Sequence, residues 1–501
     1  MATNGVNLIG TSTVSRSMGG TGVAFYSHAT EAIGKNVALM GDLDKKDEFQ
    51  LDMTYFRAFV TSSVRDDNPL NTTPSNGHAE VSDSQNMPDT NFLPTMSYAT
   101  RIDDQTVFGF AMIGAAGMAA NFKGDYGHRQ LKSSMMLMKL VPAISYRQGN
   151  TTFGFAPVLG LGSMSLNYDD NYRQSDGTVY PNGTKPQSNR EGLFGTNVGG
   201  SDLIPALGFT LGMDVKVTKK FRIGMSYNSA LKYTYKDVAN FSQFGPNGMV
   251  SMADEYTNGA LQNYRNSNID GNNFGNGSQT LAEYLNSDFG IPLDVGNALT
   301  ALMPKGLVGS ALDKTDPQNL DDLTLEQPWE IAVGVSYEVT KKMTLTADYR
   351  YVAWGLAEGY KDFGWQNQQV IALGMEFKAK KYSYRFGYNY AESPISQITG
   401  EKGALLTNVE GHYIFDQALS MLNMVGFPAI ATTHFTAGFG RDLTDDLHLD
   451  VGMVYAPKVT HSRSGSLLPA DYIVSNLSFF NYKYETSMEQ ISLSMGLNYK
   501  F

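Results

Sequence analysis

The chain has 501 residues, a net charge of −11 and no cysteine, and 17% of its residues are charged. The absence of cysteine excludes a disulfide framework and a thiolate metal site, and the negative charge argues against nucleic acid as a partner. No run of about 18 apolar residues occurs, which excludes a membrane-spanning helix but leaves open a crossing by strands that are only half apolar.

Residues 1–48 lack the regular alternation that begins at Phe49. They are rich in Gly, Ser and Thr, and they contain no charged region followed by an apolar run. If the protein is exported, we therefore expect its signal peptide to have been removed. A compact segment ahead of a β-barrel can lie inside it as a plug. We predict an N-terminal hatch over residues 1–48, with a frayed or periplasmic tail as the alternative.

From Phe49 onward, apolar and polar residues alternate in segments of roughly 10–15 residues, which is long for a globular strand and suits a tilted crossing of a bilayer. In the last segment the odd-numbered positions from Ile491 to Phe501 are apolar, and the even-numbered positions from Ser492 to Lys500 are polar or glycine. Other polar faces carry full charges, which are prohibitive in a dry core and ordinary in a polar lumen. The pattern predicts strands with one face toward lipid.

The connections between these segments are alternately short and long. Short ones are residues 101–105, 147–151, 217–221, 339–343 and 441–446, and long ones cover roughly residues 62–90, 169–203, 236–328, 392–432 and 460–486. Short periplasmic turns and long external loops are typical of outer-membrane barrels. We therefore predict an all-β fold, a transmembrane antiparallel β-barrel of about fourteen strands over residues 49–501.

Two long connections contain clusters of apolar residues. In residues 236–328 these are Leu285, Phe289, Leu299, Leu302, Met303 and Leu307, and a second patch covers residues 416–430. Exposed apolar patches often mark binding sites, so the clusters predict an extracellular surface that captures hydrophobic molecules. The alternative is that these loops pack on each other, and the two interpretations are compatible.

Enzyme and metal signatures are weak. Neither G-x-S-x-G nor H-E-x-x-H occurs, and "NIDGNNFGNG" lacks the spacing of a calcium loop. The histidines are scattered, and the only suggestive pair is His448 with Asp450, which packing in a polar lumen explains better than catalysis. The sequence therefore predicts no catalytic residue, no metal and no cofactor.

Several segments together resemble the FadL/TodX family of outer-membrane transporters for long-chain fatty acids and other hydrophobic compounds. "SRSMGGTGVAF" and "KNVALMGD" look like the plug of that family, "VFGFAMIGAAGMAANF" is similar to its third strand, and residues 328–391 follow in family order. Two features depart from the family. Its Asn-Pro-Ala element here reads Asn36-Val37-Ala38, which loses the rigidity of proline, and the insertion before "HFTAGF" is longer than we expect.

The resemblance implies a monomeric barrel of fourteen strands in a bacterial outer membrane, in contact with lipid and lipopolysaccharide and inserted by the barrel-assembly machinery. The ligand would land among external loops, move to an apolar pocket beside the hatch and leave sideways at a kinked third strand. The hatch and pocket residues that it suggests are Arg16, Val23, Phe25, Lys35, Asn36, Val37 and Ala38.

The third strand offers a candidate for that lateral opening. Residues 106–122 contain four consecutive small residues, Gly114, Ala115, Ala116 and Gly117. Glycine inside a strand often marks a bulge or a bend, and small side chains can leave a hole in the wall. The alternative is that the glycines only make room for side chains of the plug.

The expected ligand is a long-chain fatty acid, carried by passive diffusion through a hatch-gated barrel without nucleotide. Its carboxylate would meet a cation, and Arg16 and Lys35 are the candidates, although a charge paired with the barrel is an alternative for each. An uptake channel for aromatic or aliphatic hydrocarbons and a small-solute porin are the alternative functions.

Overall fold

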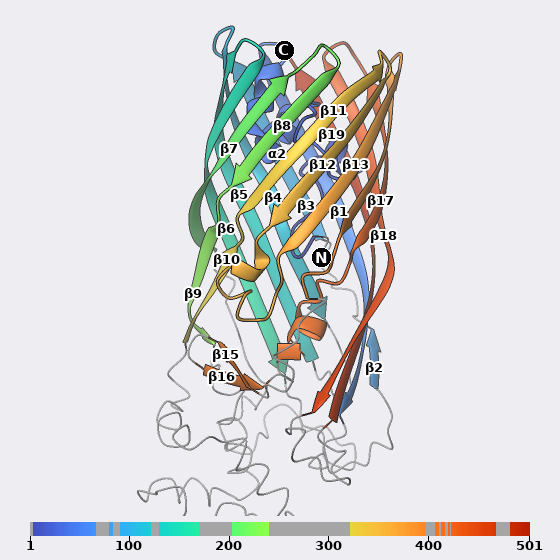
Figure 1. Cartoon of the computed structure of the whole chain (residues 1–501). Coiled ribbons are helices and arrows are strands. Elements are labelled where there is room, and N and C mark those ends of the chain that lie inside the picture. The colour runs from blue at the N-terminus through green and yellow to red at the C-terminus, as the bar shows by residue number, and fades with distance from the viewer. Residues whose placement is uncertain are drawn as a thin grey trace, which may run out of the picture.

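The computed structural model describes residues 4–66, 80–83, 91–121, 130–169, 203–239, 321–395, 406–409, 412–415, 419–420, 422–466 and 481–501. In these ranges the main sheet has 15 antiparallel strands, and β2 pairs only with the far end of β1. The remaining fourteen close into a barrel through the pairing of β1 with β19, as the sequence predicts (Figure 1). No helix in the described ranges is long and apolar enough to cross a membrane.

The barrel strands, in order around the wall, are β1 (Asp47–Asp66), β3 (Asn91–Arg101), β4 (Thr106–Asn121), β5 (Gln130–Gln148), β6 (Thr151–Asp169), β7 (Ile204–Lys216), β8 (Phe221–Asn228), β11 (Glu330–Thr340), β12 (Met343–Val352), β13 (Gln368–Ala379), β14 (Tyr382–Ala391), β17 (Thr433–Asp442), β18 (Leu447–Ser466) and β19 (Asn481–Lys500). The other strands are β2 (Glu80–Asp83), the paired β9 (Leu231–Ala239) and β10 (Asp321–Gln327), and the paired β15 (Leu406–Val409) and β16 (His412–Phe415). The named helices within the described ranges are α1 (Thr13–Ser17), α2 (Ala29–Lys35), η1 (Val37–Asp42), η4 (Trp354–Leu356) and η5 (Leu422–Gly426).

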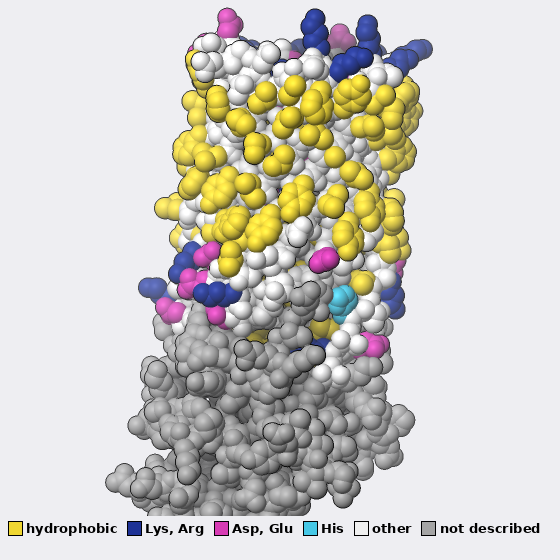
Figure 2. All heavy atoms as spheres, viewed as in Figure 1, with side chains coloured by type: hydrophobic (Ala, Val, Ile, Leu, Met, Phe, Trp, Pro, Cys, Tyr) yellow, Lys and Arg dark blue, Asp and Glu magenta, His cyan; other side chains and the backbone are white. Residues whose placement is uncertain are grey.

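The two faces of the wall differ as the alternation predicts. In β19, Leu493, Met495 and Leu497 are exposed on the outer face, and Ser494 and Asn498 are buried on the inner face. Figure 2 shows hydrophobic side chains (yellow) in a broad band across the visible face of the wall, with Lys, Arg, Asp and Glu gathered above and below the band. This arrangement places apolar residues against lipid and polar residues in the lumen.

Several strands are longer than predicted. β1, β18 and β19 have 20 residues each, and they stay paired to their far ends, where Asp66 lies opposite Tyr482 and Ser466 lies opposite Asn481. Because neighbouring strands satisfy each other's backbone groups, the ladder can continue beyond the length that a bilayer requires.

One predicted strand is broken. The alternation from Phe221 to Tyr235 predicts a single strand, but β8 ends at Asn228 and β9 begins at Leu231 with its apolar side chains turned inward. Ser229 bonds through its backbone N–H and its Oγ to the backbone of Phe209. Tyr233 then fills space over glycines of β6, because a Cβ at Gly160 would lie 2.3 Å from its hydroxyl.

The N-terminal segment, residues 4–46, lies within the barrel toward the end with the short turns (Figure 1). α1 contacts β17 and β18, α2 contacts β3 and β4, and η1 contacts β5, β6 and β7. Most of its residues are buried, including polar ones such as Glu31 and Asn36. The lumen at this end is therefore filled with protein.

The inner wall meets this segment through glycines. We call them the glycine belt, and they are Gly109, Gly154, Gly212, Gly224, Gly334, Gly374, Gly387, Gly438 and Gly452. A Cβ on any of them would lie under 3.0 Å from an atom of the N-terminal segment. At Gly154, Gly224 and Gly387 the belt lets the backbone of the segment lie directly against the backbone of the wall, and at Gly109, Gly438 and Gly452 it makes room for side chains of the segment.

Candidate functional site

The ladder between β3 and β4 ends early. The two strands pair from Arg101 opposite Val107 up to Thr95 opposite Ile113, yet β3 begins four residues earlier and β4 continues to Asn121. Pro94, the next residue on β3, has no N–H to donate. Beyond Thr95 and Ile113 the described part of the wall therefore has no backbone pairing between these two strands.

β4 is irregular at the same point. Its pairing with β5 shifts register between Gly114 and Ala116, so that Ala115 is an extra, bulged residue. Val6, Asn7 and Leu8 of the N-terminal segment pair here: the Leu8 N–H donates to Ala115 O at 3.4 Å, and the Gly117 N–H donates to Val6 O at 3.3 Å. Residues 6–8 of the N-terminal segment thus supply backbone hydrogen bonds to β4 at a point where β3 supplies none.

A small pocket of about 10 Å³, which has room for roughly one water molecule, lies beside this opening. It is lined by Leu8, Ile9, Arg16, Phe56, Val454, Gln490, Ile491 and Ser492. Leu8 and Phe56 also form a small apolar cluster with Leu93 of β3. The pocket therefore lies between the N-terminal segment and the wall formed by β1, β18 and β19. Its lining is mostly apolar and also includes Arg16, Gln490 and Ser492.

The two predicted cations hold the backbone next to this pocket. Arg16 is 3% exposed and its Nε donates to Gly10 O at 3.1 Å. Lys35 is 7% exposed and its Nζ donates to Ile9 O at 3.3 Å. Of the two, only Arg16 lines the pocket.

Four of the other predicted hatch residues, Val23, Asn36, Val37 and Ala38, lie against glycines of the belt, and none of these four lines the pocket. The Asn36 side chain donates to Val23 O at 2.7 Å and to Met213 O at 3.0 Å, and its Oδ1 accepts from the Ala38 N–H at the start of η1. Val23 and Val37 are buried and Phe25 is half-buried. Capping by Asn36 explains how η1 can begin at Val37 without the proline of the family element.

The predicted capture surface, Leu285, Phe289, Leu299, Leu302, Met303 and Leu307, lies outside the described residues. The described part of the second patch, residues 416–430, is inside the barrel mouth, where Thr486 Oγ1 donates to Met424 O at 2.6 Å. It contacts an aromatic cluster that sequence reasoning missed, Trp354, Tyr360 and Trp365, through the bond from Trp365 Nε1 to Asn423 Oδ1 at 2.8 Å.

Comparison with known proteins settles the family. Residues 3–272 match the family described as outer membrane protein transport protein (OMPP1/FadL/TodX), which is more than half of the chain. The chain belongs to this family. It is accordingly a multi-pass protein of the Gram-negative outer membrane and a transport channel rather than an enzyme, in a family that carries hydrophobic compounds.

Solved structures of FadL/TodX proteins have the same fold. The toluene transporter TbuX of Ralstonia pickettii is 16% identical over 99% of both chains, with a TM-score of 0.54. The toluene transporter TodX of Pseudomonas putida is 14% identical over the whole of both chains, with a TM-score of 0.55. A FadL homologue of Pseudomonas aeruginosa is 13% identical over 99% of this chain and 100% of its own, with a TM-score of 0.56. No curated protein matches the sequence.

In this FadL/TodX chain, basic residues of the short-turn end hold the end of η1. Asp42 bonds to Arg147, to Arg222 and, at 2.6 Å, to Lys216 Nζ. Arg101 donates to Leu43 O. Burial alone would raise the pKa of the Asp42 carboxyl, but the charges of Arg222 and Lys216 outweigh it and hold that pKa below its usual value.

Asp42→Asn is therefore expected to loosen η1. Charge-assisted hydrogen bonds contribute about 1.5–3 kcal/mol, so amide hydrogen exchange over residues 37–43 should accelerate roughly 10–100-fold. Because the folded pKa of Asp42 is below the unfolded value of about 3.9, the wild-type protection should be complete above about pH 5 and be lost only as the pH falls through the folded pKa. Exchange mass spectrometry across pH measures both effects.

Asp44→Asn is the matched control, because Asp44 is a more exposed acid that pairs with Lys500 at the rim. It should leave exchange over residues 37–43 near the wild-type rate. Unchanged exchange in Asp42→Asn, or wild-type protection that is already lost between pH 7 and 5, would contradict this account.

Proposed function

We propose that this chain carries long-chain fatty acids inward across the outer membrane by passive diffusion, as a monomer, with residues 1–48 as a hatch and a lateral exit at the bulge of β4. The single observation that carries the fatty-acid assignment is the composition of the pocket. Apolar side chains of Leu8, Ile9 and Phe56 suit an alkyl chain, and the guanidinium of Arg16 suits a carboxylate. The pocket of about 10 Å³ must widen to admit the chain, so the proposal includes movement of the N-terminal segment on binding.

The proposal of a lateral exit is supported by the irregular pairing of β3 and β4 in the barrel wall. The missing ladder between β3 and β4 and the bulge at Ala115 lie beside the pocket and are partly covered by Val6–Leu8. A ligand that moved this short stretch aside would reach the unpaired edge of β4, where the flanking side chains are small. The filled lumen at the short-turn end favours a sideways route over a straight one.

The hatch is needed for release. Burying about fifteen CH₂ groups gains roughly 12 kcal/mol, equivalent to a dissociation constant near 1 nM before association costs. Binding of the fatty acid is then favourable, and its release requires a change in the pocket that lowers the affinity. Arg16 now bonds to Gly10 O, so a carboxylate that draws Arg16 away would free the backbone of Gly10, which follows Ile9 in the pocket lining. Ligand binding would in this way loosen the hatch.

Arg16→Met tests the assignment. Loss of one charge-assisted contact should weaken binding of a fatty acid about 10–100-fold and slow its uptake at low concentration, while uptake of toluene stays near the wild-type rate. The measurement is uptake of labelled oleate and of labelled toluene into proteoliposomes that contain the purified protein.

Lys35→Met is the matched control, because Lys35 also holds the backbone of the segment but does not line the pocket. It should affect both ligands alike. If Arg16→Met instead slows oleate and toluene equally, Arg16 is only a structural cation and the fatty-acid assignment fails.

An aromatic hydrocarbon is the second candidate ligand. The aromatic cluster Trp354, Tyr360 and Trp365 in the barrel mouth has ring centroids 4.7–5.1 Å apart, and two of the similar structures are described as toluene transporters. Faster saturable uptake of toluene than of oleate by the wild-type protein would favour this candidate.

A further inference from the structure

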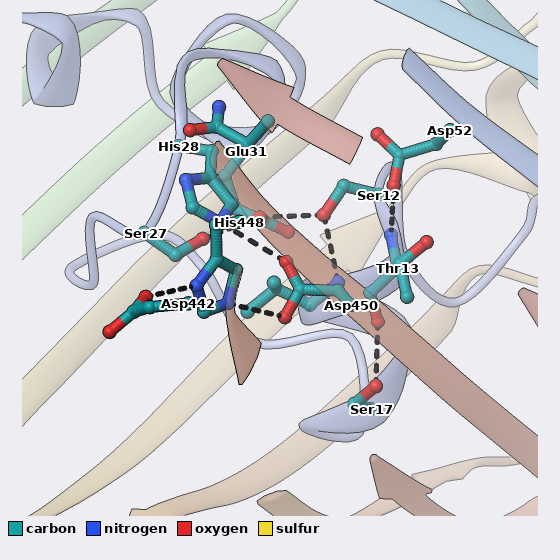
Figure 3. Close-up of polar contacts among 12 residues, drawn as sticks. Ser12, Thr13, Ser17, Ser27, His28, Glu31, Asp52, Asp442, His448 and Asp450 are labelled. Carbon is teal, nitrogen blue, oxygen red and sulfur yellow. Dashed lines mark hydrogen bonds and ion pairs between the residues drawn. The ribbon is translucent and has the colours of Figure 1, made fainter. Parts of the chain in front are cut away.

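Two histidines and an aspartate meet where the N-terminal segment contacts β18 (Figure 3). His28 precedes α2, and His448 and Asp450 lie near the start of β18 on its inner face. His28 Nε2 is 3.2 Å from Asp450 Oδ2, and His448 Nε2 is 3.1 Å from Asp450 Oδ1. The ligand atoms of all three residues lie within 4.8 Å of one another.

We propose that His28, His448 and Asp450 bind one divalent transition-metal ion, such as Zn²⁺, which ties the N-terminal segment to the barrel wall. In a tetrahedral site with bonds of about 2.0–2.1 Å, neighbouring donor atoms are about 3.3 Å apart. The two nitrogen–oxygen separations are close to that value, but they involve different oxygens of Asp450, and a set with one atom per residue lies within 4.8 Å. Binding of one ion through a single carboxylate oxygen therefore requires the Asp450 carboxylate or a histidine ring to turn. Two imidazoles with one carboxylate favour zinc and its neighbours over calcium or magnesium, which prefer oxygen ligands alone.

The second ring nitrogens support the site independently. His448 Nδ1 is 2.5 Å from Asp442 Oδ1, and His28 Nδ1 is 3.8 Å from Glu48 Oε1 without a hydrogen bond. Metal-binding histidines usually direct the nitrogen that does not bind the metal toward such an acceptor, which orients the ring and strengthens the ligand. With a proton on each Nδ1, both Nε2 lone pairs would be available to the ion.

The proton count of His448 leaves a position that a cation can fill. A carboxylate only accepts hydrogen bonds, and His448 faces a carboxylate oxygen with each of its two nitrogens. A neutral His448 that donates from Nδ1 to Asp442 would therefore direct a lone pair at Asp450. Either a second proton or a cation must lie between Nε2 and Asp450, and a metal ion would satisfy His28 at the same time.

The surroundings favour added positive charge. Glu31, Glu48 and Asp52 are buried near the three residues, and Glu31 Oε1 and Asp52 Oδ2 have no hydrogen-bond partner in the described ranges. Two cations compete in this region. Arg385 bonds to Asp450 Oδ1 at 2.5 Å and to Glu376 at 2.9 Å, and Lys500 Nζ is 3.8 Å from Glu48 Oε2.

One ligand oxygen and a route from solvent remain available to the ion. Asp450 Oδ2 has His28 as its only hydrogen-bond partner among the described residues. The His448 side chain is 16% exposed and that of Asp442 is 49% exposed, so solvent has access to the site from the rim.

Zinc binding to the full-length chain tests the proposal. The purified, tag-free protein in detergent is stripped with a chelator and titrated with ZnCl₂ against a chromophoric competitor, and bound metal is counted by mass spectrometry. We expect one tightly bound zinc per chain. His28→Ala and His448→Ala should each weaken this binding at least 100-fold, and Asp442→Asn should weaken it about 10–100-fold.

His461→Ala is the matched control, since His461 is a partly buried histidine on the same strand and should leave zinc binding unchanged. Heat-modifiable migration on gels shows that each variant is folded, and Asp442→Asn, which alters a half-exposed residue, keeps the test valid if a histidine variant does not fold. No zinc uptake by the wild-type protein, or equal uptake by folded variants, overturns the proposal and leaves a network bridged by protons.

Discussion

Replacing Gly224 and Gly387 by alanine is expected to unseat the N-terminal segment and make the protein permeable to small polar solutes. A Cβ at Gly224 would lie 1.9 Å from Val23 O, and one at Gly387 would lie 2.1 Å from the Gly19 backbone nitrogen. Overpacking typically costs about 1–3 kcal/mol per site. Because backbone atoms cannot move aside as side chains do, we expect the upper end of that range, or roughly 100-fold in the seated population, for each site.

Swelling of liposomes in a small sugar measures this leak, and limited proteolysis within residues 4–46 measures the release of the segment. Gly149→Ala is the control: Gly149 lies in a short turn with nothing within 4 Å of a new Cβ. Alanine there strains the turn backbone, because φ is +61, but it causes no collision with the N-terminal segment. Wild-type permeability together with an intact, protease-resistant segment in the double variant would refute the steric role of the belt.

Joining β3 to β4 by a disulfide is expected to abolish uptake of hydrophobic ligands without opening or closing the lumen. An ideal Cβ at Gly114 lies 3.7 Å from Leu93 Cβ, within the range of about 3.5–4.5 Å that a disulfide spans. The chain has no cysteine, so Leu93→Cys/Gly114→Cys introduces the only possible bridge. Under oxidising conditions we expect at least a tenfold loss of oleate or toluene uptake, which a reductant restores.

Thr54→Cys/Ser494→Cys is the matched control, because these residues face each other across the closed β1–β19 ladder and their hydroxyls are 2.8 Å apart. A bridge there constrains the wall without crossing the opening and should leave uptake near the wild-type rate. Full uptake by the oxidised Leu93→Cys/Gly114→Cys protein would exclude a lateral exit between β3 and β4.

Local patterns in the sequence were sufficient to predict the barrel. The alternation from Ile491 to Phe501 gives the two faces of β19, and short turns alternating with long loops give the strand order. The run from Gly114 to Gly117 also indicated an irregular strand, and a bulge lies there. These features are local because a strand exposes its residues with period two wherever it pairs.

Contacts between distant parts of the chain could not be predicted in the same way. His28 and Asp450 are 422 residues apart, and no local pattern relates a short coil segment to its place on the wall. The break at Ser229 was missed because Leu231 and Tyr233 keep the parity of the preceding strand while facing inward. The glycine belt did leave a trace, since glycine recurs on the polar face in "FGF", "VGV" and "FGY".

The glycine belt also limits how such a sequence can diverge over time. A methyl group gained at Gly224 collides with Val23, and a methyl group gained at Gly387 collides with Gly19. At these positions the wall therefore cannot accept a larger residue without a change in the N-terminal segment. Substitutions in the wall become acceptable only in lineages where the segment has shortened or shifted. The N-terminal segment and the inner wall should therefore be inherited as a matched pair. In a chimera that joins the segment of one relative to the barrel of another, side chains of that barrel would collide with a segment to which they are not matched.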